Sequence, residues 1–211
     1  MRESVNFLFV IDVSGSMYGQ KIASVNASIA ECIAELKQIG ASGQYDIKIS
    51  VVAFADRMKI HKLNEKTDQI GAVHVKVEPH EDELYPITSF GCLYIGLKYL
   101  IENNIITDEK QGKNTFIFLF SDATPVDEKE YNAAYEAIQD CAAYKNATKY
   151  VGYAEDESDM YNRDTVRFVD YKADHIVRAS EMSGEIGKLQ MAFFPDFTSQ
   201  SDNAKYDQIF T

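Results

Sequence analysis

VNFLFVIDVSGS, residues 5–16, is the stretch of sequence that decides the fold of this chain. Its first seven residues form a nearly continuous apolar run that ends at Asp12, a pattern typical of a strand covered by helices on both faces. A second run of the same kind, TFIFLFSD at residues 115–122, also ends in an aspartate. Two such strands predict the centre of a mainly parallel sheet.

The remaining segments alternate between helix and strand patterns. Apolar residues recur at helical spacing over residues 21–39, 91–103, 127–144 and 181–191. Strand patterns lie at residues 46–54, 149–153 and 175–178. Residues 64–87 are predicted to be mostly loop, with a candidate short strand at 73–77. The basic segment at 57–63 predicts an antiparallel edge strand, since charged side chains protect a sheet edge. The alternation therefore predicts a doubly wound α/β fold, Rossmann-like, with helices on both faces of the sheet.

Length and charge limit the organisation and the partners of the chain. Its 211 residues suit one α/β domain, which we assign to residues 1–192, followed by a packed or flexible tail at 193–211. The 33 acidic residues exceed the 21 basic ones and give a net charge of −12, which disfavours nucleic acid and anionic membranes as partners.

The cysteines and the first residues bear on the compartment. Cys32, Cys92 and Cys141 are isolated in the sequence and give no disulfide framework, which fits a reducing compartment. The first residues hold neither a secretory signal nor a spanning segment. We therefore expect a cytoplasmic protein.

Polar residues that follow the predicted strands are the first candidates for function, because ligands of doubly wound sheets bind at the carboxyl ends of the strands. Asp12, Ser14 and Ser16 follow the first strand, Thr88 precedes a helix, and Asp122 ends the second central strand. All five offer hard oxygen donors, which suit Mg²⁺ or Mn²⁺, with Ca²⁺ as an alternative, and lack the sulfur and imidazole usual for zinc. The sequence predicts a divalent cation site and no catalytic residue.

The charges of these residues indicate what the cation could do. Asp12 and Asp122 supply at most two negative charges, and the three hydroxyls are neutral. The ion would therefore stay electrophilic, and an Asp or Glu of a partner protein could replace a metal-bound water. This arithmetic favours a protein-binding module.

The pattern Asp12-x-Ser14-x-Ser16, followed by a threonine before a helix and an aspartate after an apolar strand, resembles the metal-ion-dependent adhesion site (MIDAS) of von Willebrand factor A (VWA) domains. The resemblance extends over about residues 4–190. The surrounding stretches IDVSGSMYGQKIASVN, residues 11–26, and LFSDATPVD, residues 119–127, resemble the bacterial tellurium-resistance TerY-like branch.

The resemblance implies a role for each residue of the pattern. Ser14, Ser16 and Thr88 would bind the metal through their hydroxyls, and Asp12 and Asp122 directly or through water. TerY-like domains are typically encoded beside a PP2C-type phosphatase and a Ser/Thr kinase, which implies such partners and a scaffold in stress response or signalling.

The chain departs from the TerY-like branch at two places. Tyr85-Pro86-Ile87 stands where that branch has a glycine-rich run before the threonine. Asp122-Ala123-Thr124 stands where it has Asp-Gly-Glu.

An enzymatic alternative is a Mg²⁺-dependent haloacid-dehalogenase-like phosphatase with Asp12 as its nucleophile. That chemistry needs a second carboxylate two positions on to protonate the leaving group, and this chain has Ser14 there. The binding module is therefore the main prediction, and the phosphatase is the alternative.

Overall fold

The computed structural model describes residues 3–79, 85–106, 114–123, 125–154 and 160–193. Within these residues the centre is a six-stranded sheet of order β3-β2-β1-β4-β5-β6, parallel except for the pairing of β2 with β3. Its strands are β1 Glu3–Asp12, β2 Tyr45–Phe54, β3 Met58–Lys66, β4 Thr115–Ser121, β5 Thr148–Tyr153 and β6 Ile176–Arg178. The predicted fold, including the antiparallel edge strand, is confirmed. The acidic stretch 80–84 and the tail beyond residue 193 lie outside the described residues.

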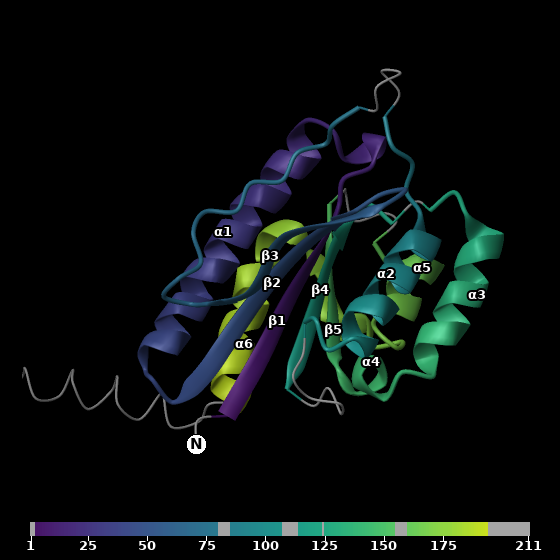
Figure 1. The fold of residues 1–211 in the computed structure, drawn as a ribbon. Helices are drawn as coiled ribbons and strands as arrows, with labels where there is room; N and C mark the ends of the chain where they lie inside the picture. The colour runs from purple at the N-terminus through teal and green to yellow at the C-terminus, as the bar shows by residue number, and fades with distance from the viewer. Residues whose placement is uncertain (1–2, 80–84, 107–113, 124, 155–159, 194–211) are drawn as a thin grey trace, which may run out of the picture.

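Helices cover both faces of this sheet (Figure 1). One face carries α1 Gln20–Ala41 and α6 Met182–Phe193. The other carries α2 Phe90–Glu102, α3 Glu128–Gln139, α4 Ala142–Asn146 and α5 Arg163–Phe168. Short 3₁₀ helices are η1 Gly15–Met17, η3 Ala173–His175 and η4 Ala179–Glu181. No helix in the described part of the chain is long and apolar enough to cross a bilayer.

The two central strands are apolar at nearly every position because both of their faces are buried. In β1, Phe7 and Phe9 pack against α1 and α6, while Leu8 and Val10 pack beneath α2 on the other face. The register of β1 with β4 pairs Ile11 with Phe120. The polar residues that follow these two strands therefore emerge side by side at the carboxyl edge of the sheet.

The prediction of mostly loop at 64–87 is confirmed for the described residues that follow β3, and the candidate strand at 73–77 does not form. Val75 and Val77 are buried against the core of the α1 face, while Lys76 between them is exposed. Asn26 of α1 holds the segment in place: its Nδ2 donates to the Val75 carbonyl and its Oδ1 accepts from the Val75 N–H, both at 2.8 Å. An asparagine side chain thus takes the place of a neighbouring strand, and the segment lies along α1 (Figure 1).

The single helix predicted at 127–144 is wrong, because it is divided into α3 and α4 at Asp140 and Cys141. Continued from Ile138, the buried stripe of α3 would next reach positions near 141, 142 and 145. The residues buried here are instead Ala143 and Tyr144, so the break rotates the chain until these side chains face the sheet. The sequence pattern also missed α5.

Candidate metal site

The turn after β1 begins at Asp12, whose side chain is completely buried. The Ser14 N–H donates to Asp12 Oδ1 at 2.9 Å, and the chain then enters η1. Val13 N–H donates to the Phe54 carbonyl of β2, which anchors the start of the turn to the sheet. The turn is therefore fixed by backbone contacts, and the alternate residues Asp12, Ser14 and Ser16 direct their oxygens toward one region.

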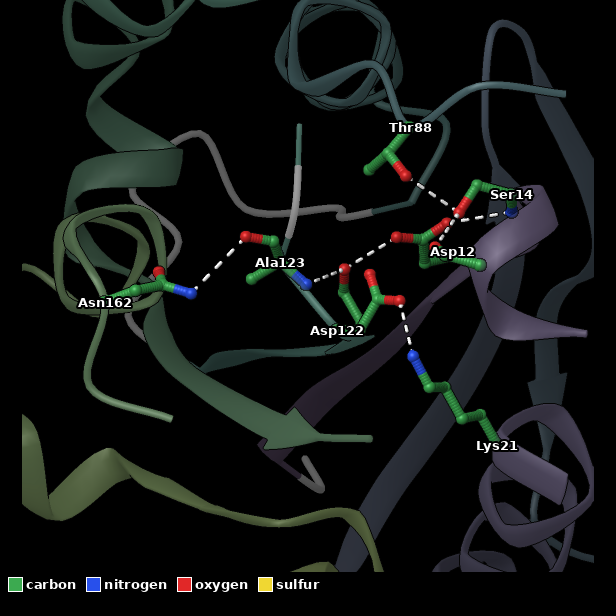
Figure 2. A network of polar contacts seen from close by, with 9 residues as sticks. Asp12, Ser14, Lys21, Thr88, Asp122, Ala123 and Asn162 are labelled. Carbon is green, nitrogen blue, oxygen red and sulfur yellow. Dashed lines mark hydrogen bonds and ion pairs between the residues drawn. The ribbon is translucent and has the colours of Figure 1, made fainter. Parts of the chain in front are cut away.

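Three hydroxyl groups meet beside Asp12, and Figure 2 shows two of them, those of Ser14 and Thr88. The Ser14 and Ser16 oxygens are 3.1 Å apart, and the Thr88 hydroxyl donates to Ser14 Oγ at 2.8 Å. Ser14 and Thr88 are buried, whereas Ser16 is exposed. The group is thus held from within and reaches solvent on the side of Ser16.

The loop that carries Thr88 is tied to the loop after β4. Val126 N–H donates to the Thr88 carbonyl at 3.1 Å. Ser89 is the N-cap of α2 and accepts from the Cys92 N–H. The Asp127 carboxylate accepts from the Ser89 hydroxyl and from the Phe90 and Gly91 N–H groups. A carboxylate at a helix N-terminus is favoured by the helix dipole, so Asp127 stabilises the position of Thr88.

The first turn packs closely against the segment before Thr88 at Gly15. Gly15 N–H donates to the Pro86 carbonyl at 2.8 Å. A Cβ added at Gly15 would lie 2.7 Å from Tyr85 Cβ, which is shorter than real contacts allow. The close approach of the two loops thus needs a glycine in the first turn, and Tyr85 and Pro86 pack where the TerY-like branch has glycines.

Burial shapes the acidity of Asp12. Burial raises the pKa of this carboxyl to about 6, and the nearby charge of Asp122 also raises it. Hydrogen bonds from Ser121 and Ser14 act in the opposite direction and lower the pKa. Ser121 Oγ donates to Asp12 Oδ2 at 2.6 Å and itself accepts from the Ala123 N–H. A buried carboxylate of this kind is stabilised by a cation bound beside it.

The Asp122 carboxylate is paired with the ammonium group of a lysine. Lys21 Nζ of α1 lies 3.0 Å from Asp122 Oδ2, and the Asp122 side chain is almost fully buried (Figure 2). The next residue, Ala123, has a left-handed φ of 51°, and its carbonyl accepts from Asn162 Nδ2 at 3.4 Å. A sharp turn immediately after β4 therefore sets the direction of Asp122. Its left-handed conformation explains why a glycine suits this position in the TerY-like branch.

The five predicted residues form one group at the carboxyl edge of the sheet. Hydrogen bonds link Asp12, Ser14, Ser16 and Thr88 in a chain, and Asp122 acts on Asp12 through its charge. In the described part of the chain no cluster of three or more His, Cys, Asp or Glu could hold a metal. A donor set of hydroxyls and two carboxylates fits Mg²⁺ or Mn²⁺.

Sequence reasoning missed three residues around this group, namely Ser121, Lys21 and Asp127. Ser121 carried a signal, since it is a polar residue at the end of an apolar strand. Lys21 and Asp127 reach the site from helix starts, and no spacing rule points to their contacts.

Comparison with protein families decides which group of proteins this arrangement represents. The family model of the von Willebrand factor type A domain matches residues 6–190. The chain belongs to the VWA family. Domains of this family mostly serve in protein–protein interactions. A comparison with curated proteins gave no match.

Solved structures agree with this VWA fold. A von Willebrand factor type A protein from Catenulispora acidiphila is 13% identical with a TM-score of 0.55, and the match covers 89% of this chain and 42% of that one. Proximal thread matrix protein 1 from the mussel byssus is 10% identical with a TM-score of 0.51, covering 89% and 45%. The chain spans less than half the length of these two proteins, and the similarity bears on the fold alone.

The cluster of three hydroxyls in this VWA domain lies in a hollow of about 340 Å³ whose wall is partly apolar. Its lining includes Ser14, Ser16 and Thr88 and the apolar residues Tyr85, Ile87 and Val126. These three apolar residues are between 44% and 64% exposed. The exposed Tyr18 ring extends this apolar rim, with its centre 5.4 Å from that of Tyr85. Exposed apolar side chains that surround a polar centre are typical of a protein-binding surface.

Proposed function

We propose that this VWA domain is a metal-dependent protein-binding module of the MIDAS type. The observation that carries the proposal is the meeting of three hydroxyls from two loops beside a buried aspartate. Ser14, Ser16 and Thr88 would hold Mg²⁺ or Mn²⁺, with Asp12 and Asp122 as direct or water-mediated ligands. The bound cation supplies a Lewis acid that attracts a carboxylate.

The charge balance supports capture of a partner's Asp or Glu. The two aspartates at most neutralise a divalent ion, and Lys21 already offsets part of the charge of Asp122. A third carboxylate is therefore attracted to the cation. The apolar rim formed by Tyr18, Tyr85, Ile87 and Val126 would then exclude water around the new contact, as rims do at protein interfaces.

The sequence around the site supports a biological setting. The stretches at 11–26 and 119–127 resemble the tellurium-resistance TerY-like branch. We therefore propose a cytoplasmic scaffold in a bacterial stress-response or signalling system, with a Ser/Thr kinase or a PP2C-type phosphatase as the partner.

The phosphatase alternative is not favoured. Ser14 stands where a general acid is needed, and its hydroxyl is engaged by Thr88 and lies beside Ser16. A panel of phosphate esters with Mg²⁺ present tests this point. Turnover that is lost in Asp12→Asn would support the enzyme and overturn the binding-only proposal.

Isothermal titration with Mg²⁺ and then with a partner tests the binding proposal. Thr88→Ala removes one hydroxyl, and we expect it to weaken partner binding by tenfold to a hundredfold, from a cost of about 1–3 kcal/mol. EDTA should weaken binding at least as much. The parent protein should bind one divalent ion.

The matched control is Thr148→Ala, because Thr148 is the first residue of β5 and lies at the amino-terminal end of the strands, away from the metal site. This variant should bind metal and partner as the parent does. Partner binding that is equal with Mg²⁺, with EDTA and in Thr88→Ala would show that the metal face is not the binding face.

A further inference from the structure

A second hollow, of about 670 Å³, lies beside the hollow of the metal site. Pro86 lines both, so they share a wall. Val13, the neighbour of Ser14 in the chain, lines the second hollow, together with Ala53 and Ala55 from the end of β2. A peptide that leaves the metal site across Pro86 therefore enters this second hollow.

The lining of the second hollow is rich in basic and titratable side chains. The basic and imidazole groups are Arg57, Lys59, His61, His74 and Lys76. The acidic groups are Asp56 and Glu78, and Asp56 lies 3.9 Å from the Arg57 guanidinium. Among the described residues of the lining, three basic residues thus face two acidic ones, with two histidines added. The charge of this described lining is opposite in sign to the net charge of −12 of the chain.

The side of the hollow formed by residues 74–78 is held in a defined conformation. Val75 is buried and is bound in both directions by the Asn26 side chain. Because side chains alternate along an extended segment, His74 and Lys76 lie on the exposed side. The backbone that carries His74 and Lys76 is therefore held in place, which lowers the entropy cost of binding an anion.

Burial is the main influence on the acidity of His61, which lines the hollow. Burial lowers the pKa of this imidazole, the charge of Lys59 lowers it further, and Glu78 acts in the opposite direction. The Lys59 ammonium thus acts on the interior of the hollow. Burial disfavours a charge of either sign there, and the Lys59 ammonium offsets part of this cost for a negative charge.

We propose that this hollow is a second subsite for the same partner, and that it binds an acidic stretch next to the Asp or Glu on the metal. The inference rests on the proposed function. The volume falls in the range that accepts several side chains, and the ammonium groups of Lys59 and Lys76 complement carboxylates. The ligand is therefore an Asp- or Glu-rich peptide segment of the partner that crosses Pro86.

Fluorescence anisotropy with two labelled probes tests the proposal. One probe is a capped tetraglutamate peptide, and the other is a capped peptide with a single glutamate between glycines. Each is titrated with the full chain in Mg²⁺ and in EDTA. The single glutamate reports on the metal site, and the difference between the probes reports on the second hollow.

The informative variant is Lys59→Gln with Lys76→Gln. Its control is Lys37→Gln with Lys145→Gln, which removes two exposed lysines that do not line the hollow. Both change the net charge from −12 to −12 − 2 = −14. We expect the first pair to weaken tetraglutamate binding about tenfold and the control pair much less. Single-glutamate binding and Mg²⁺ binding should not change.

The results separate the two proposals. Tetraglutamate binding that falls equally in both pairs, or that is not measurable with the parent protein, would overturn the second subsite. Loss of all binding in EDTA, with no effect of Lys59 and Lys76, would support the metal site and overturn the subsite. Binding that survives EDTA but weakens in the first pair would support the subsite and count against the metal-dependent function.

Discussion

Replacement of Lys21 by methionine should make the stability of this domain depend on metal. The Lys21 ammonium lies 3.0 Å from Asp122, with side-chain exposures of 25% and 1%. The Coulomb attraction at this distance is about 5 kcal/mol at an effective dielectric constant of 20. Exposed pairs contribute up to about 1 kcal/mol, and breaking fully buried pairs costs about 3–5 kcal/mol. We therefore expect Lys21→Met to lower the free energy of unfolding by about 2 kcal/mol without metal.

The same change should strengthen Mg²⁺ binding, because the cation no longer competes with an ammonium for Asp122. If the whole loss is recovered on binding, the affinity rises by up to about thirtyfold. For a domain of this size, 2 kcal/mol corresponds to about 4–8 °C in the melting temperature. The variant should therefore melt lower than the parent in EDTA and approach it in saturating Mg²⁺.

Thermal unfolding in EDTA and in Mg²⁺, together with calorimetric titration, measures both effects. Lys37→Met is the matched control, since Lys37 is an exposed lysine of the same helix. An unchanged melting temperature of Lys21→Met in EDTA would refute the role of the ion pair. Weaker Mg²⁺ binding than in the parent would show that Lys21 assists the cation.

Three further predictions follow from the site and its supports. The affinity for Mg²⁺ should be nearly constant above pH 6 and fall by up to about tenfold per pH unit below it. The reason is that protons compete with the cation for Asp12, whose pKa is raised to about 6. Calorimetric titrations at pH 5 and 7.5 check this. Gly15→Ala should weaken Mg²⁺ binding at least severalfold while the fold is kept, since the added methyl group displaces Tyr85 and its loop. Calorimetry measures the binding and circular dichroism the fold. Mg²⁺ binding equal to that of the parent protein would contradict this role of Gly15. Asn26→Ala should lower the free energy of unfolding by about 2–3 kcal/mol, because the N–H and carbonyl of buried Val75 lose their partner; a loss below about 0.5 kcal/mol in urea unfolding would show that the segment does not need this contact.

The sheet could be predicted because burial on both faces leaves a direct record in the sequence. In β1 and β4 the apolar run ends where the chain leaves the core, so Asp12 and Asp122 mark the carboxyl edge. The same rule brought Thr88 into consideration, since its loop starts a helix that packs on the sheet. The strand order, which places the ends of β1 and β4 side by side, was not predicted and comes from the structure.

Features that depend on single long-range contacts could not be predicted. The segment around Val75 has the alternation of a strand, and only the Asn26 side chain decides that it lies along α1. The break between α3 and α4 depends on which face Tyr144 must present to the core. Lys21 meets Asp122 across 101 residues of sequence, and a lysine at a helix start gives no sign of such a partner.

Asp127 serves the starts of two helices at once, because it is the N-cap residue of α3 and its carboxylate binds the first N–H groups of α2. Together with the bond from Val126 to the Thr88 carbonyl, it makes the beginnings of α2 and α3 a single mechanical unit. The position of Thr88 is therefore set by the starts of two helices and not by its own loop alone. A substitution at Asp127 would alter the Thr88 loop and the beginning of α2 together.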